Sequence, residues 1–121
     1  MVLLTPPPDP TDPARLQVEA DRTCDRLRSM SLVRLAAPRP HGPTRAGAAF
    51  ALAATLADAR ADLVGRPRRQ LPELPDPAAG DVLAVCANDL VEAVRTRPGD
   101  PDAARICGDA VRALIALRRD L

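Results

Sequence analysis

The 121-residue chain has the length of a single domain and carries 17 basic and 16 acidic side chains, which gives a formal net charge of +1. This balance argues against a sequence-wide electrostatic attraction to nucleic acid or to an anionic membrane. Every basic residue is arginine, which excludes lysine-dependent chemistry such as Schiff-base formation, and Phe50 is the one aromatic side chain.

Residues 1–11 are rich in proline and are expected to form an extended, flexible tail. The rest of the chain, residues 12–121, is expected to fold as a single helical bundle domain. The apolar run at the N-terminus is short and lacks a basic flank, so it does not have the pattern of an export signal. The longest apolar stretch, residues 46–57, is too short to span a membrane.

Three cysteines, Cys24, Cys86 and Cys107, lie far apart in the sequence and form no Cys-x-x-Cys pair. Together with the lack of an export signal, this pattern favours reduced thiols and a cytoplasmic location. Each cysteine falls on the apolar side of an amphipathic segment. We therefore expect all three to pack in the core as small hydrophobic side chains.

Proline pairs divide the chain into four apolar runs with helical spacing. Asp is a good N-cap because its carboxylate accepts hydrogen bonds from the unpaired N–H groups of the first turn, and Pro suits the first helical position. The pairs are Asp12-Pro13, Gly42-Pro43, Asp76-Pro77 and Asp100-Pro101. This punctuation predicts helices that begin within two residues of Pro13, Thr44, Pro77 and Pro101.

The four expected helices differ in how much of their surface is apolar. The first, residues 13–30, has a narrow apolar stripe and looks peripheral, whereas the second, residues 44–65, is apolar around most of its circumference. The third and fourth, residues 77–96 and 101–120, have broad apolar arcs and a short connection, which predicts an antiparallel hairpin. The sequence thus predicts an all-α, four-helix, mostly antiparallel bundle with a Pro-rich N-terminal tail and two Pro-rich loops.

Residue patterns for catalysis or metal binding are missing from the sequence. The cysteines do not have the spacing of a tetrahedral metal site, and His41 is the single histidine, in a Pro-rich loop. The glycines are isolated rather than grouped in a phosphate-binding loop. We therefore assign no catalytic, cofactor-binding or metal-ligating residue, and the sequence favours a protein that is not an enzyme.

Arg60 is a charged residue within an apolar arc of the second helix. A guanidinium on such a face needs a partner or must extend to the helix end, because an unpaired buried charge is costly. In an antiparallel pair of the second and third helices, Arg60 would lie near Asp81. We expect an Arg60–Asp81 ion pair, with binding of a ligand carboxylate by Arg60 as the alternative.

Two groups of arginines suggest a possible phosphate-binding surface. Arg105, Arg112 and Arg119 recur every seven residues in the last helix, and Arg66, Arg68 and Arg69 cluster in the second loop. Acidic residues interleave with the first group, and no aromatic residue accompanies either group for base stacking. These features argue against nucleic acid as a partner.

The surplus of apolar surface on the second helix favours contact with another chain. Its small residues would allow close approach across a two-fold axis, and the candidate interface residues are Ala48, Ala51, Ala54 and Thr55. The first hypothesis is therefore a non-catalytic helical protein-interaction module that self-associates as a homodimer. One alternative is a small-molecule-binding or enzymatic bundle with an interhelical pocket near Arg60, and a second is a nucleic-acid-associated regulator that uses the arginine clusters.

Overall fold

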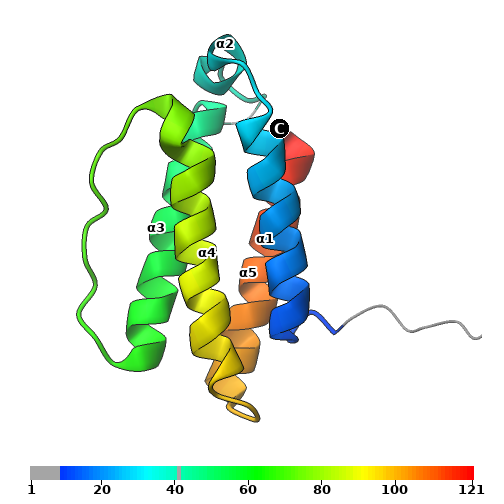
Figure 1. Cartoon of the computed structure of the whole chain (residues 1–121), viewed down its shortest axis with the longest axis vertical. Helices are drawn as coiled ribbons and strands as arrows, with labels where there is room; N and C mark the ends of the chain where they lie inside the picture. The colour runs from blue at the N-terminus through cyan, green and yellow to red at the C-terminus, as the bar shows by residue number, and fades with distance from the viewer. Residues whose placement is uncertain (1–8, 41) are drawn as a thin grey trace, which may run out of the picture.

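A computed structural model of the chain describes residues 9–40 and 42–121 (Figure 1). In chain order, the elements are α1 (Pro13–Arg28), α2 (Leu32–Ala36), α3 (Arg45–Val64), the 3-10 turn η1 (Asp76–Ala78), α4 (Ala79–Arg95) and α5 (Pro101–Asp120). The described residues contain no β-sheet, and an isolated bridge joins Pro38 and Thr44. The all-α prediction is confirmed. Most of the predicted tail, and also His41, lie outside the described residues.

The helices begin where the proline pairs predict, to within two residues. Asp12 caps α1 by accepting a hydrogen bond of 2.9 Å from the N–H of Ala14, and Asp100 caps α5 by accepting one of 2.9 Å from the N–H of Asp102. Thr44 caps α3 in the same way. The prediction that Asp76 caps a helix is wrong. Asp76 lies in the 3-10 turn η1, which precedes α4, and its side chain makes no capping hydrogen bond.

The directions of the long helices differ from the predicted arrangement. Figure 1 shows α1 and α5 running one way along the bundle and α3 and α4 running the other way. α4 packs mainly against α3 and α1, and α5 packs mainly against α1 and α3. The α3/α4 and α1/α5 neighbours are therefore parallel, and the mostly antiparallel arrangement is not observed.

The strap, residues 65–75, makes the parallel α3/α4 pair possible. It leaves the end of α3 and returns along the outside of the bundle to the start of α4 (Figure 1). A 20-residue helix such as α3 is about 30 Å long, and an extended strap of this length reaches about 35 Å. The strap is therefore long enough to carry the chain back over the full length of α3.

The last two helices are joined by a short turn, as predicted, but they do not pack against each other as a hairpin. A short turn, residues 96–100, joins α4 and α5, and the two helices run in opposite directions. They share fewer contacts with each other than either shares with its main neighbours. The space between them is occupied by α1 and α3, so α1 is not peripheral as predicted but packs against both helices.

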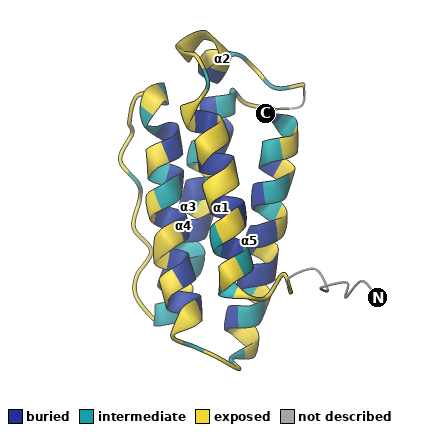
Figure 2. Ribbon diagram, turned by 45° about the vertical axis from the view of Figure 1, so that its right-hand side comes forward, coloured by how far each residue is buried: buried dark blue, intermediate teal, exposed yellow. Residues whose placement is uncertain are grey.

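Leucine and alanine side chains form most of the core. Figure 2 shows buried residues on the facing sides of the long helices and exposed residues on their outer sides. Six leucines are almost fully buried, namely Leu16, Leu27, Leu56, Leu83, Leu90 and Leu114. Small residues bring the backbones close: a Cβ added to Gly80 of α4 would lie 3.3 Å from the carbonyl oxygen of Cys24 in α1. No helix in the described part of the chain is long and apolar enough to cross a membrane.

The three cysteines are buried and form no disulfide, as expected for core residues. Burial raises the pKa of the Cys24 and Cys107 thiols from 9.0 to about 11, and it also raises the pKa of Cys86. A raised pKa means that the folded state holds the thiol proton more tightly than the unfolded chain does. The core is therefore a poor environment for thiolate chemistry.

The capping geometry leads to a comparison of two aspartates. Replacing Asp100 with Ala removes hydrogen bonds to the first turn of α5 and is expected to lower the free energy of unfolding by about 1 kcal/mol. Asp76→Ala removes no capping bond and is expected to change it by less than about 0.5 kcal/mol. Urea denaturation followed by circular dichroism measures both, and equal losses would contradict the assignment of the caps.

The buried thiols lead to a prediction about labelling and pH. At neutral pH, iodoacetamide should react slowly with Cys24 and Cys107 in the native protein and rapidly in denaturant. The unfolded chain releases these protons near pH 9 and the folded chain near pH 11, so the free energy of unfolding should decrease as the pH rises between these values. Rapid native labelling of either residue, read by mass spectrometry, would contradict their burial.

Candidate functional site

Helix α3 carries the candidate interface residues, and the fold places them in different surroundings. Ala48 is buried, at 8% exposure, and Ala54 is half-buried. Ala51 and Thr55 are exposed. The outer side of α3 is therefore only partly covered by its own chain, and three of the larger hollows of the surface border it.

The first hollow runs along α3 and α5 and is called here the α3–α5 furrow. It consists of two depressions, of about 270 and 380 Å³, that share Leu52 and Ala113 and are therefore continuous. Its apolar walls are formed by Ala48, Ala51, Leu52 and Ala59 of α3 and by Ile106, Ala110, Ala113, Ala116 and Leu117 of α5. Three of the four candidate interface residues, Ala48, Ala51 and Thr55, line this furrow.

The charged residues of the furrow pair within the chain. Arg105 lies 3.8 Å from Asp109 in one depression, and Arg39 lies 2.8 Å from Asp120 in the other. Pairing of this kind leaves no isolated charge along the furrow. The surface between the two pairs is made of alanine, leucine, isoleucine and Pro43, with Thr55 as its one hydroxyl.

The second hollow lies between α3 and the strap and has a volume of about 690 Å³. Arg68 fastens the strap to α3 through two hydrogen bonds to Asp62, of 3.0 and 2.7 Å, and a longer contact with Asp58. Leu71 of the strap packs against the core, whereas Leu74 is 42% exposed. The strap is thus anchored at a few side chains and leaves an open groove along α3.

The third hollow, called here the Arg60 groove, lies where α3, α4 and the strap meet. It has a volume of about 420 Å³, and its charged lining residues are Arg60, Arg66, Arg69 and Asp89. Its apolar lining comes from Ala57, Ala61, Pro67, Leu71 and Val85, together with Cys86 of α4. Arg60 is half-buried, and its side chain makes no ion pair or hydrogen bond with a described residue.

The predicted Arg60–Asp81 ion pair is wrong. Asp81 instead accepts a hydrogen bond of 2.8 Å from Nε of Arg28, which extends from α1. The error follows from the helix directions: because α3 and α4 are parallel, Asp81 lies at the start of α4 while Arg60 lies near the end of α3. Asp89, eight residues after Asp81 in α4, lines the same groove as Arg60.

The arginine ridge of α5 is largely neutralised by neighbouring acids. Arg105 contacts both Asp102 and Asp109, and Arg112 pairs with Asp109. Arg119 makes no such contact with a described residue. The ridge therefore presents alternating charges to solvent, which is the pattern of an ordinary exposed helix face.

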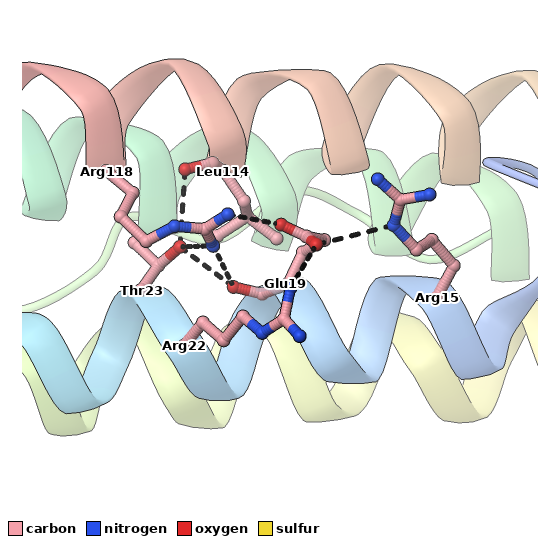
Figure 3. Close-up of polar contacts among 6 residues, drawn as sticks. All are labelled: Arg15, Glu19, Arg22, Thr23, Leu114 and Arg118. Atoms are coloured by element: carbon pink, nitrogen blue, oxygen red, sulfur yellow. Dashed lines mark hydrogen bonds and ion pairs between the residues drawn. The ribbon is translucent and has the colours of Figure 1, made fainter. Parts of the chain in front are cut away.

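A buried polar cluster between α1 and α5 was not predicted from the sequence (Figure 3). Glu19 is 2% exposed and accepts a hydrogen bond of 2.7 Å from Arg118, while Arg15 and Arg22 lie 3.3 and 3.5 Å from its other carboxylate oxygen. Thr23 is fully buried, and its hydroxyl contacts the carbonyl oxygens of Glu19 and Leu114. Every buried side-chain polar atom among the described residues has a partner.

The position of Glu19 in the sequence contains a signal of its burial. The residue lies three positions after Leu16 and four before Thr23, so it falls on the same side of the helix as both. Burial acts to raise the pKa of Glu19, but the hydrogen bond and charge of Arg118, together with Arg15, outweigh it and lower the pKa below 4.5. The carboxylate is therefore held in its charged form.

The chemistry of this cluster is that of a structural ion pair. A general acid or base needs a pKa near the working pH, whereas the pKa of Glu19 is lowered away from neutrality. No group of three or more His, Cys, Asp or Glu side chains in the described part of the chain could hold a metal ion. The cluster thus joins α1 to α5, and the surfaces open to partners are those around α3.

The buried cluster predicts an effect of Glu19→Gln on stability. The substitution leaves Arg118 without its charge partner and should lower the free energy of unfolding by about 3 kcal/mol. The Glu19 carboxylate stabilises the fold above about pH 4.5, and this contribution is lost as the pH falls, so wild type and variant should converge in acid.

A matched control for this substitution is Glu92→Gln. Glu92 pairs with Arg95 at 3.2 Å on an exposed face of α4, where an ion pair contributes less than about 1 kcal/mol. Urea denaturation at several pH values measures both variants. Equal losses for Glu19→Gln and Glu92→Gln would show that the buried pair does not stabilise the helix contact.

Comparison with known proteins does not assign the chain to a family. No protein-family model, no curated protein and no solved structure matches the chain significantly. The surfaces around α3 and the buried cluster are thus the observations from which a function is inferred. Fold alone does not define a function, which depends on the chemistry of these surfaces.

Proposed function

We propose that the protein is a non-catalytic helical interaction module that self-associates through the α3–α5 furrow. The observation that supports this proposal is a continuous apolar furrow between two neighbouring helices that the rest of the chain leaves partly open. Contiguous apolar surface of this kind commonly marks a contact with another protein. A homodimer is the simplest assembly, because a two-fold axis lets one surface serve both partners.

The residues of the furrow suit the approach of a second helix. Alanines dominate its walls, and small side chains let two helix backbones come close and gain many weak contacts. The ends are bordered by ion pairs within the chain, so covering the furrow does not bury an unpaired charge. A second copy that crosses at Ala51 and Thr55 would meet an identical apolar surface.

The two alternatives concern other surfaces. A nucleic-acid-associated regulator would need free arginines along α5, yet Arg105 and Arg112 are paired with aspartates of the same helix. A ligand pocket near Arg60 has its own support in the geometry of the Arg60 groove. That groove lies on another side of α3, so it does not compete with the furrow for the same residues.

Self-association predicts that a charge placed in the furrow separates the subunits. Thr55→Glu on α3 and Ala116→Glu on α5 would each bring two like charges into an apolar contact. Each should raise the dimer dissociation constant at least about 30-fold, which corresponds to a loss of ~2 kcal/mol. Sedimentation velocity over a range of concentrations measures this change, and circular dichroism checks that the helical signal is kept.

The control places the same charge on an exposed alanine away from the furrow, Ala14→Glu in the first turn of α1. This variant should sediment like the wild type. A wild type that stays monomeric at high micromolar concentration would contradict self-association. Dissociation by Ala14→Glu as readily as by Thr55→Glu would place the interface elsewhere.

A further inference from the structure

We propose that the Arg60 groove binds a small organic anion that carries a carboxylate or phosphate group on an apolar body. This inference does not depend on self-association, because the groove and the α3–α5 furrow are formed by different sides of α3. Three observations support it: the unpaired arginines of the groove, its apolar lining and its size.

The arginines of the chain fall into two groups. Twelve of the 17 make an ion pair or a hydrogen bond within the described structure, either to a carboxylate or, for Arg34, Arg45 and Arg97, to backbone carbonyl groups. The side chains of the remaining five make neither with a described residue: Arg26, Arg60, Arg66, Arg69 and Arg119. Three of these five line the same groove.

This concentration of unpaired charge has an energetic consequence. With three arginines and one aspartate, the charged lining of the groove sums to 3 − 1 = +2, in a chain whose net charge is +1. Arg60 is half-buried on a largely apolar helix, where an unpaired guanidinium is poorly solvated. An anion in the groove would relieve the repulsion between these like charges and supply the missing acceptors.

The rest of the lining indicates what the anion carries. Ala57 and Ala61 of α3, Val85 of α4 and Leu71 of the strap provide an apolar wall. Val85 borders the groove directly and is 60% exposed, which is unusual for a large apolar side chain on an amphipathic helix. A ligand with an apolar body would cover this side chain while its charged group meets the arginines.

The size and composition of the groove narrow the class of ligand further. A volume of about 420 Å³ lies within the usual range for small-molecule sites. Arginine is suited to carboxylate and phosphate, because its planar guanidinium can donate two parallel hydrogen bonds to either group. No aromatic side chain lines the groove, so stacking on a nucleobase is not available there.

The test is an NMR titration, because the chain has no Trp or Tyr to report binding by fluorescence. Hexanoate and hexyl phosphate are the probes, and each is added to the ¹⁵N-labelled full chain in low-salt buffer without other phosphate. At least one should produce saturable shifts of the amide signals of Ala57, Val85 and Cys86. The better binder identifies the charged group that the site prefers.

Substitution of Arg60 tests whether the arginines make the site. Arg60→Gln should weaken binding of the preferred probe at least about tenfold, as expected for the loss of a hydrogen bond from a charged donor. Arg69→Gln provides a second variant within the groove. The matched control is Arg26→Gln, which removes another unpaired arginine, on α1, and should leave the affinity unchanged.

Several results would overturn the proposal. One is the absence of saturable shifts around the groove with either probe. Another is equal weakening of binding by Arg60→Gln and Arg26→Gln, which would indicate a general charge effect. Inorganic phosphate that binds as tightly as hexyl phosphate, or hexanol that binds as tightly as hexanoate, would show that the groove does not recognise an amphipathic anion.

Discussion

The parallel course of α3 and α4 is the constraint on which the surface of this protein depends. The strap carries the chain back from the end of α3 to the beginning of α4, so both helices run in the same direction. This direction places Asp89, rather than Asp81, beside Arg60 and leaves Asp81 to pair with Arg28 of α1. It also brings Arg66 and Arg69 of the strap to the same groove as Arg60.

A second parallel contact, between α1 and α5, contains the buried polar cluster. Glu19 is surrounded by arginines from its own helix and by Arg118 from α5, so its burial is compensated by hydrogen bonds and opposite charge. Such a pair adds less to stability than its contacts suggest, because both charges lose water on folding. Its requirement for specific partners does, however, favour one register of α1 against α5.

The composition of the core explains why α3 is apolar on most sides. Without Trp or Tyr, the chain fills its interior with leucines and many alanines, and alanine contributes little area to burial. Helix α3 is apolar on most sides, and its contacts with α4, α5 and α2 leave only Ala51, Thr55 and Asp62 exposed among its residues. The partly exposed residues of α3 border the α3–α5 furrow and the grooves beneath the strap, which are the surfaces proposed for a second copy and for an anion.

The sequence by itself determined the features that depend on local chemistry. Helix starts at Pro13 and Pro101, the capping by Asp12 and Asp100, and the burial of the cysteines follow from residue type and spacing over a few turns. Only the tertiary structure decided the helix directions, since a strap of this length allows α4 to run either parallel or antiparallel to α3. The partners of Arg60, Asp81 and Glu19 follow from those directions, because side chains on different helices meet only where packing brings their backbones together.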